Sequence, residues 1–576
     1  MTDDATDVIV IGAGLAGLVA TCELVRAGKR VTIVEQENSQ NLGGQAFWSL
    51  GGLFLVDSPQ QRRLGVRDSF DLAWQDWQGS AQWDRLEPRG ADSRGASLAE
   101  DTWAARAGRA FVEFAASDAE PWLREQGVRL TALVGWAERG DGRASGHGNS
   151  VPRFHVPWGS GPGVSQPFAL RVRAAVDEGR VRLLFRHRVD GLKVEGGAVV
   201  GVRGHVLAAD PAPRGRPSSR DETGEFTLRA QAVVVASGGI GADHDLVRGW
   251  WPSRLGTPPA RMLTGVPAHV DGRMLEIAER AGGRLVNRDR MWHYTEGIEN
   301  WNPIWPGHGI RILPGPSPMW FDARGRRLPA PGLPGYDTLG TLRLLRTTPD
   351  IAEFDHSWFV VTQTMIAKEF ALSGSEQNPD LTSGDVRQLL RSRLGAGSPP
   401  PVSAFVDRGA DFVVADGCRE LAEKMNALTA DPSRADGGRL IDPDLLEQQL
   451  LDRDAEIENA FSKDQQVMGI RNARRYVGDR LTRVAKPHRV LDQAHGPLIA
   501  VRLHVITRKS LGGLQTDLAG RVLGADGSPV PGLYAAGEAA GFGGGGAHGY
   551  NALEGTFLAG CVFTGRSVGR SIADAV

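Results

Sequence analysis

The sequence predicts an α/β fold in which one domain is inserted into another, and three observations lead to this prediction. The chain has 576 residues, and one hydrophobic core organises only about 250–300, so at least two domains are expected. The first 35 residues have the pattern of one βαβ unit. Between about residues 288 and 479 the composition changes, and afterwards it returns to short strands and glycines.

The opening βαβ unit is predicted from hydrophobic periodicity and from the placement of glycines. Residues 7–11 (DVIVI) form a short β-branched run, and the segment GAGLAG follows it directly. An apolar-periodic helix is expected over residues 15–27, and Gly28 ends it. Residues 30–35 (RVTIVE) are the next expected strand.

The rest of the chain alternates strands with polar and helical segments. The expected elements are a tryptophan-rich, mostly helical stretch over 70–136, a β-meander over 180–204, an exposed polar loop over 211–222, a buried strand over 231–239 and a closing helix over 551–575. A segment dense in Pro, Gly and Trp over 303–334 lies in the inserted region. We therefore expect residues 1–287 and 480–576 to form the first domain and residues 288–479 to form the inserted one.

Composition excludes several classes of protein. Hydrophobic residues make up 41% and charged residues 23%, which is typical of a folded chain, and the net charge of -2 argues against a nucleic-acid binder. Cys22, Cys418 and Cys561 are far apart, so neither a disulfide framework nor a metal site is expected, and a cytoplasmic location is favoured. No apolar run approaches the roughly 20 residues of an integral membrane segment, and the acidic amino terminus does not resemble a signal peptide.

The segment GAGLAG carries the first functional signal. Gly12, Gly14 and Gly17 stand between a predicted strand and a predicted helix, which is the context of a dinucleotide-binding turn. The first glycine allows the tight turn, the second lets the backbone approach a pyrophosphate, and the third lets the helix pack closely. Glu35 ends the next strand, where a carboxylate can accept hydrogen bonds from ribose hydroxyls.

A second signal favours FAD over NAD as the dinucleotide. Residues 532–538 (GLYAAGE) resemble the distal motif of FAD-binding proteins, in which an acidic residue holds the ribityl or pyrophosphate region. The doublet of Gly43 and Gly44 and the segment from Ser237 to Gly239 support the same interpretation. NAD enzymes need only the first motif, so we expect noncovalently bound FAD.

Four segments together resemble one superfamily of flavoproteins. They are VIVIGAGLAGL, ASGGIGADHDLVRGWWP, SLGGLQTDLAGRVL and GLYAAGEAAGFGGGGAHGYNALEGTFLAGCVFTGRSVGR. The resemblance is to the fumarate reductase and 3-ketosteroid dehydrogenase superfamily, and in particular to bacterial FAD-binding dehydrogenases near the 3-ketosteroid dehydrogenases. It implies a doubly wound, Rossmann-like FAD-binding domain interrupted by an α+β cap domain, with the active site in the cleft between them.

The resemblance also implies a set of residues that contact FAD. They are Gly12, Ala13, Gly14, Leu15, Ala16, Gly17, Glu35, Gln36, Gly43, Gly44, Gln45, Ala46, Ser49, Gly51, Gly52, Val189, Ala236, Ser237, Gly238, Gly239, Gly537, Glu538, Asn551, Ala552 and Leu553. Asn551 is a good N-cap residue, and in this superfamily the amino terminus of the last helix faces the flavin pyrimidine ring. Lys509 either adds a positive charge to a reduced flavin or is a solvated lysine after a strand.

The resemblance disfavours one reaction, because residues that fumarate reductases use are missing from this sequence. Fumarate reductases hold a dicarboxylate with arginines and histidines, and His293 stands where one histidine is expected. The arginines expected near Ala547 and near residues 362–364 are absent, and Lys509 replaces a second histidine. A small dicarboxylate would therefore keep unpaired charges, so we expect a poor fumarate reductase.

Ketosteroid dehydrogenases instead use a tyrosinate to take an α-proton while the β-hydride goes to flavin N5. Residues 321–328 resemble the cap segment that precedes this base, which places the base at Tyr336. Positive charge from His293 or Arg311 would lower its pKa. The second tyrosine of the family is missing near Gly545, and His548 or Tyr550 are candidates for its role, or packing residues. Tyr294 is the next candidate base.

We therefore expect an FAD-dependent oxidoreductase acting on CH–CH bonds, which dehydrogenates a cyclic ketone such as a 3-ketosteroid. The alternatives are a fumarate- or enoate-type reductase and a flavin-containing binding protein without turnover. The expected partners are an apolar small-molecule ketone and an external electron acceptor, because no haem CxxCH or iron–sulfur cysteines are present.

Overall fold

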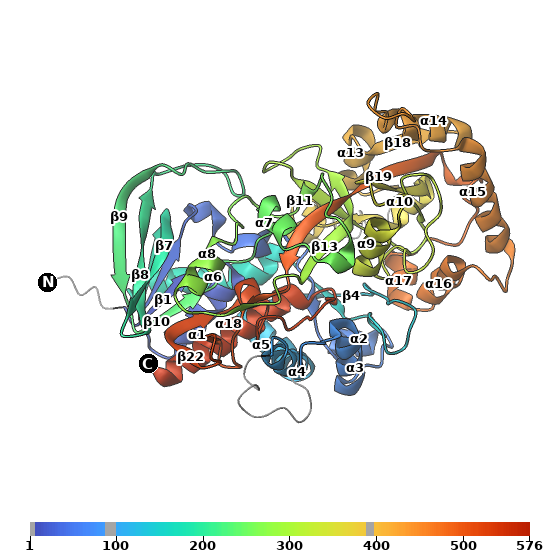
Figure 1. Ribbon diagram of the computed structural model, residues 1–576. Coiled ribbons are helices and arrows are strands. Elements are labelled where there is room, and N and C mark those ends of the chain that lie inside the picture. The colour runs from blue at the N-terminus through green and yellow to red at the C-terminus, as the bar shows by residue number, and fades with distance from the viewer. Residues whose placement is uncertain (1–5, 87–98, 388–396) are drawn as a thin grey trace.

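The computed structural model describes residues 6–86, 99–387 and 397–576, which form a mixed helix-and-sheet structure (Figure 1). A six-stranded sheet occupies one end, in the order β21–β22–β10–β1–β2–β6. Its strands are β1 (Val8–Ile11), β2 (Val31–Glu35), β6 (Val181–Phe185), β10 (Ala232–Val235), β21 (Arg521–Leu523) and β22 (Pro529–Ala535). All neighbours pair in parallel except β21 with β22. Strands from both ends of the chain therefore share one sheet.

Both faces of this sheet are covered, which explains the near-continuous apolar strands. Val8 and Val10 pack into one core with α1 (Leu15–Arg26), α6 (Ser160–Asp177) and α18 (Thr556–Ala575). Ile9 and Ile11 alternate to the opposite face and join a second core with α8 (Arg273–Arg280). An antiparallel sheet of β7 (His187–Glu195), β8 (Ala198–Leu207) and β9 (Glu222–Arg229) also packs there. This two-faced arrangement is the predicted doubly wound domain. In the β-meander expected over 180–204, β7 and β8 pair antiparallel, but β6 pairs in parallel with β2 instead, and the expected polar loop connects β8 to β9.

A second, eight-stranded sheet builds the other half of the molecule. Its main order is β15 (Met319–Phe321), β16 (Ser357–Thr362), β19 (Leu498–Ser510), β13 (Met291–Glu299), β14 (Gly309–Leu313) and β17 (Ala371–Leu372), with β11 (Leu263–Thr264) and β18 (Phe412–Ala415) pairing on β19. Strand β19 is 13 residues long and runs from this region toward the six-stranded sheet (Figure 1). The boundary expected at residue 479 therefore does not coincide with a break in strand pairing, because β19 lies beyond it and pairs with β13 and β16.

The tryptophan-rich segment is largely helical, as expected. It contains α3 (Phe70–Ala81), α4 (Thr102–Ala116) and α5 (Ala119–Gln126), beside a small sheet of β3 (Leu53–Phe54), β5 (Phe154–Pro157) and β4 (Leu130–Gly135). Trp77 and Trp122 are buried in the first core, so this segment contributes side chains to the core of the domain and does not only cover its surface.

The remaining helices and strands mostly surround the second sheet. They are α2 (Pro59–Arg63), α7 (His244–Gly249), α9 (Thr338–Thr347), α10 (Gln363–Glu369), α11 (Pro379–Thr382), α13 (Pro400–Arg408), α14 (Cys418–Leu428), α15 (Pro443–Glu458), α16 (Gln465–Ala473), α17 (Val477–Thr482), β12 (Leu285–Val286) and β20 (Gly513–Leu514). In the part of the chain that the structure describes, no helix is both long and apolar enough to cross a membrane.

The last helix begins later than predicted. Helix α18 starts at Thr556, and Gly555, with φ of +89°, is its N-cap. Asn551 is therefore not the N-cap, because its side-chain amide donates to the Ser80 carbonyl at 2.9 Å instead. The segment before α18 is a series of glycine turns, which delays the helix by one turn or more.

Candidate active site

A cavity of about 1680 Å³ lies along the carboxyl ends of β1, β2, β10 and β22. The carboxyl edge of an open parallel sheet is where such folds bind ligands. Many of the predicted cofactor residues line it: Gly12, Gly14, Leu15, Ala16, Glu35, Gln36, Gly44, Gln45, Ala46, Ser49, Gly52, Val189, Ala236, Ser237, Gly238, Gly537 and Glu538. Ala13, Gly17, Gly43, Gly51, Gly239, Asn551, Ala552 and Leu553 do not line its wall.

The three glycines of the first turn have different geometric reasons to be glycine. A Cβ at Gly12 would lie 2.7 Å from the Ala236 carbonyl oxygen, and its φ is +101°. A Cβ at Gly17 would lie 2.2 Å from the Gly12 carbonyl oxygen, so this glycine allows α1 to pack. A Cβ at Gly14 would meet nothing within 4 Å. Since Gly14 lines the cavity, that open space is a cradle that a side chain would fill.

Two backbone amides fix the Glu35 carboxylate at the same end of the cavity. Its carboxylate accepts hydrogen bonds from the backbone amides of Ala13 at 2.8 Å and Glu37 at 2.9 Å. These contacts fix the carboxylate at the cavity wall, where it can accept from ribose hydroxyls. Gly43 donates its amide to the Ala13 carbonyl at 2.9 Å, so the glycine doublet is bound to the first turn.

Lys509 and Glu538 form one polar group at the cavity wall. The Lys509 ammonium lies 3.2 Å from Glu538 Oε2 and 2.6 Å from Gln45 Oε1. Glu538 also accepts from the Ser510 amide at 3.0 Å. Lys509 is therefore not a freely solvated lysine, and its charge is compensated by Glu538 within the protein.

The amino terminus of α18 faces the cavity even though Asn551 does not cap it. Gly555, Phe557, Leu558 and Cys561 line the wall, and Gly555 provides no side-chain cap. The first backbone amides of a 20-residue helix thus lie at the cavity, where they favour negative charge.

A second cavity of about 1230 Å³ adjoins the first, and its wall is largely apolar. It is lined by apolar side chains from β4, β5 and β14, including Leu133, Val134, Val156 and Leu313, with Leu64 and Leu381. Five residues line both cavities: Leu50, Phe154, Arg311, Leu313 and Glu554. We call this shared wall the junction.

The junction carries a buried ion pair beside an aromatic ring. Arg311 Nη1 lies 2.5 Å from Glu554 Oε1, and the Arg311 guanidinium lies 3.6 Å from the centre of the Tyr294 ring. Tyr294 lines the first cavity. Burial and then the charge of Glu554 raise the pKa of Tyr294, so its hydroxyl keeps its proton and can donate a hydrogen bond.

Tyr336 lines neither cavity, although Arg139 and Asp479, the charged residues nearest to it, line the second. Its ring centre is 5.9 Å from the guanidinium of Arg139, and Arg139 pairs with Asp479 at 2.8 Å. Burial raises the pKa of Tyr336 even though Arg139 opposes that shift, so a tyrosinate is not favoured there. The positive charge expected from Arg311 goes to Tyr294 instead.

His293 and His548 are core residues rather than cavity residues. His293 Nδ1 accepts from the Arg508 amide at 3.0 Å, and burial lowers its pKa to about 3. His548 packs among Trp77, Phe542 and Phe557, and burial lowers its pKa to about 3. Both ring nitrogens of His548 are buried without a hydrogen-bond partner among the described residues. Neither imidazole lines a cavity wall.

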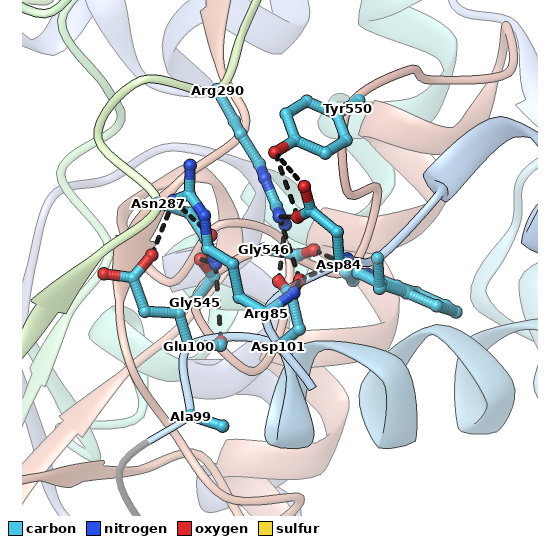
Figure 2. Close-up of polar contacts among 12 residues, drawn as sticks. Asp84, Arg85, Ala99, Glu100, Asp101, Asn287, Arg290, Gly545, Gly546 and Tyr550 are labelled. Atoms are coloured by element: carbon cyan, nitrogen blue, oxygen red, sulfur yellow. Dashed lines mark hydrogen bonds and ion pairs between the residues drawn. The ribbon is translucent and has the colours of Figure 1, made fainter. Parts of the chain in front are cut away.

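Tyr550 belongs to a polar network behind the glycine-rich segment (Figure 2). Its hydroxyl donates to Asp84 at 2.9 Å, and Arg290 lies 4.2 Å from the centre of its ring. Arg290 in turn makes two hydrogen bonds to Asp101, at 2.5 and 2.9 Å. Figure 2 also shows Asn287, whose amide donates to the Gly545 carbonyl at 3.2 Å. The network connects the glycine-rich segment before α18 to the chain around Asp84 and Asp101. The Tyr550 hydroxyl is therefore already hydrogen-bonded within the protein.

Sequence reasoning missed Glu554 and assigned Arg311 to a different tyrosine. The local signal for Glu554 is slight, namely one acidic residue in the run AHGYNALEG. Arg311 and Glu554 are 243 positions apart, so their contact exists only in the folded chain.

Comparisons with known proteins agree with this geometry. A family model described as FAD binding domain matches residues 7–558. A KsdD-like steroid dehydrogenase from Mycobacterium tuberculosis is 57% identical over 568 residues, covering 99% of this chain and 96% of the relative.

Solved structures support the fold. A 3-ketosteroid Δ1-dehydrogenase from Sterolibacterium denitrificans, in complex with 1,4-androstadiene-3,17-dione, has a TM-score of 0.65 at 16% identity, with both chains covered completely. An open flavocytochrome c3 fumarate reductase has a TM-score of 0.61 at 20% identity, covering 99% of this chain and 78% of that one. Similarities at this identity establish the shared fold and do not separate the two activities.

Proposed function

The chain belongs to the FAD binding domain family, and on this premise we propose that it removes two hydrogens from adjacent carbons of a 3-ketosteroid or steroid-like ketone. It is an FAD-dependent dehydrogenase of the group that includes the KsdD-like steroid dehydrogenases. Identity of 57% over nearly the whole of both chains supports a related substrate. The description of these relatives as dehydrogenases supports this direction of the reaction.

The observation that carries the substrate class is the apolar cavity beyond the junction. A rigid polycyclic ketone has mostly hydrocarbon surface and one polar end, and the second cavity offers eight Leu, Val and Phe side chains beside six charged ones. Burial of such a surface stabilises binding by roughly 25 cal/mol per Å². The polar groups at the junction face the cofactor cavity, so the substrate's ketone end would lie toward FAD.

The residues of the first cavity fit FAD, which we propose is held noncovalently. Gly14 leaves the space for the pyrophosphate, Glu35 is placed for the ribose, and the α18 amino terminus suits a negatively charged group. Cys561 lines the same wall, but burial raises the pKa of its thiol to about 12. A neutral thiol is a poor nucleophile, which argues against a covalent flavin link at this residue.

Bound FAD would supply the two-electron acceptor for the reaction. The protein's own residues would orient the ketone and exclude water. Tyr294, whose hydroxyl keeps its proton, is placed to donate a hydrogen bond to the ketone oxygen, which acidifies the neighbouring C–H bond. Tyr336 remains a candidate from the sequence, and the test below includes it.

A fumarate-type reaction is disfavoured by the charges at the junction. Arg311 is the guanidinium on both cavity walls, and it already pairs with Glu554. At the junction a dicarboxylate would therefore meet an arginine that is already compensated, beside the apolar side chains of Leu50, Phe154 and Leu313.

Rapid mixing of the purified yellow protein with a panel of 3-ketosteroids and with succinate tests the proposal. We expect loss of flavin absorbance with at least one ketosteroid and none with succinate, and poor fumarate turnover with a reduced viologen. Mass spectrometry of acid-released cofactor should give free FAD. A protein reduced by succinate as fast as by the best ketosteroid would contradict the substrate class.

We also propose that an external acceptor reoxidises the flavin and that the protein works in the cytoplasm. The sequence contains three cysteines and no CxxCH, so an internal haem or iron–sulfur cluster has no ligands. All three cysteines are free thiols, which suits a reducing compartment. The net charge of -2 gives no support for a nucleic-acid partner.

A further inference from the structure

The junction identifies where the proton of the dehydrogenation would go. If FAD occupies the first cavity and the ketone occupies the second, the reacting carbons must lie where the two cavities share a wall. Of the five residues on that wall, Leu50, Phe154 and Leu313 carry no titratable group. Arg311 stays protonated and cannot accept a proton. Glu554 is left as the group on the shared wall that can act as a base.

From this geometry we propose that Glu554, oriented by Arg311, accepts the α-proton of the ketone substrate. This assignment rests on the proposed function. Arg311 holds Glu554 Oε1 at 2.5 Å in a charge-assisted hydrogen bond, which keeps the carboxylate at the wall. The side chain of Glu554 is 10% exposed, so little water competes for it.

The other carboxyl groups near the junction have other close partners or lie off the shared wall. Glu138 lines the second cavity only; its oxygens bind His147 at 2.9 Å and the Thr338 hydroxyl, and it lies 3.7 Å from Arg311 Nη2. Asp479 lines the same cavity and pairs with Arg139 at 2.8 Å. Glu296 lies 3.6 Å from Arg311 Nε but lines neither cavity. At the cofactor end, Glu538 is bound by Lys509.

Several titratable groups surround the pair of Arg311 and Glu554. Burial lowers the pKa of His147, but its hydrogen bond to Glu138 and the charge of Asp337 raise it overall, so His147 compensates Glu138. Burial raises the pKa of Glu296, although the charge of Arg311 opposes the shift. Burial also raises the pKa of Tyr294, and Arg508 on β19 is the other cation near that ring. Arg311 makes its shortest contact with Glu554, at 2.5 Å, against 3.6 Å to Glu296 and 3.7 Å to Glu138.

The proposed step balances in atoms and electrons. The α C–H bond breaks, its proton goes to the Glu554 carboxylate, and its electron pair forms the new C=C bond. The adjacent β C–H bond breaks at the same time, and its hydrogen leaves with two electrons to bound FAD. Glu554 later returns the proton to solvent, and the external acceptor takes the two electrons.

Glu554→Gln tests the assignment, with Glu296→Gln as its matched control. The two side chains are close together and both contact Arg311. Glutamine has nearly the shape of a protonated glutamic acid, so it should change little at Glu296 but should remove the base at Glu554. We expect flavin reduction by the 3-ketosteroid to slow by about 10²-fold or more in Glu554→Gln and to stay within about threefold in Glu296→Gln.

Two further readouts separate catalysis from binding and structure. The Kd of a ketosteroid, measured calorimetrically, should stay within about threefold in Glu554→Gln, because only the base is lost. Glu554→Asp keeps a carboxylate and should recover part of the rate. If Glu554→Gln loses FAD because Arg311 is left unpaired, the double variant Arg311→Met/Glu554→Gln removes both charges and is measured in its place.

Reduction of Glu554→Gln, or of the double variant, at near wild-type rate would overturn the assignment. A wild-type protein that binds ketosteroids without being reduced would instead overturn the proposed function. In that case exchange of the bound ketone's α-hydrogens with D₂O, followed by NMR, still decides the role of Glu554. Exchange that is lost in Glu554→Gln supports the assignment, and exchange that is equal in both proteins, or absent from both, overturns it.

Discussion

The cofactor end of the first cavity and the junction differ in which parts of the protein form them. The cofactor end consists of backbone turns, with Gly12, Gly14 and Gly44 on the wall and the Glu35 carboxylate fixed by two amides. The junction consists of side chains, with Tyr294 and Arg311 from two strands and Glu554 from the segment before α18. The cofactor end should therefore be sensitive to added volume, and the junction should be sensitive to changes of charge or of single polar atoms.

The difference also divides binding from chemistry. A flavin needs a shaped channel and few charged contacts, because helix and turn amides supply the polar groups. Proton transfer needs one ionisable group held at one place, and that place is the junction. Changes at the cofactor end should remove the flavin, whereas changes at the junction should leave a yellow but slow enzyme.

The largest expected effect comes from adding volume at the cofactor end. Gly14→Val should abolish FAD binding, because its side chain would enter the open space at the cavity wall. The fold should survive, since a Cβ at this position meets no protein atom within 4 Å. The measurements are flavin content by absorbance and secondary structure by circular dichroism. Gly417→Val is the control, because Gly417 is exposed, extended and equally free of contacts. A yellow Gly14→Val protein would contradict the cavity assignment.

The second effect tests whether the glycine-rich segment depends on charges behind it. Arg290→Met should destabilise the protein by about 3–5 kcal/mol, because Asp101 would become a buried carboxylate without its main partner. Urea unfolding monitored by tryptophan fluorescence gives the free energy. Arg288→Met is the control, since its pair with Glu279 is partly exposed and should contribute less than about 1 kcal/mol. Equal losses of unfolding free energy in both variants would show that this network contributes no more than a partly exposed ion pair.

The cofactor end and the junction differ in how far the sequence could predict them. The first turn, Glu35 and the distal GLYAAGE segment are short motifs whose geometry is fixed within a few residues, and the βαβ unit follows from periodicity alone. The junction depends on contacts across 243 positions, and β19 joins the second sheet from beyond the expected boundary at residue 479. Periodicity describes one element at a time, so it cannot show which distant elements meet.

The tyrosines illustrate the same limit. The segment before Tyr336 resembles the family's cap motif, yet that ring packs beside Arg139, which lines the second cavity, and does not line either cavity itself. Tyr294 had a weaker case in the sequence, but β13 and β14 bring it against Arg311. A motif gives the order of residues along the chain, and the position of a loop relative to a cavity depends on the packing around it.

The third effect changes one polar atom at the junction. Tyr294→Phe should slow ketosteroid-driven flavin reduction by roughly 10- to 100-fold, because the ketone loses a hydrogen-bond donor. Tyr336→Phe should stay within about threefold, since its hydroxyl lies on neither cavity wall. Both variants should keep the wild-type flavin spectrum. Stopped-flow traces across the pH range decide between them, and a large loss in Tyr336→Phe alone would restore Tyr336 as the base.

The smallest effect concerns His548, which lies in an aromatic cluster with Trp77, Phe542 and Phe557. Burial lowers its pKa to about 3, whereas an unfolded histidine has a pKa of about 6.5. Between these values the unfolded chain binds one more proton than the folded chain, so stability falls as the pH falls from 6.5 toward 3. Each pH unit in that window costs about 1.4 kcal/mol.

His548→Phe should remove that cost while leaving catalysis unchanged. We expect the variant to gain about 1 kcal/mol over wild type on going from pH 7 to pH 5.5, measured by urea unfolding at each pH. His155→Phe is the contrasting variant, because His155 is buried but binds Ser58 at 2.6 Å and the Arg153 carbonyl at 2.9 Å. Its replacement strands these partners and should destabilise the protein at every pH. A His548→Phe protein whose stability falls with acidification as steeply as wild type would show that this imidazole is not buried in its neutral form. Loss of ketosteroid turnover in a stable variant would return His548 to the active site.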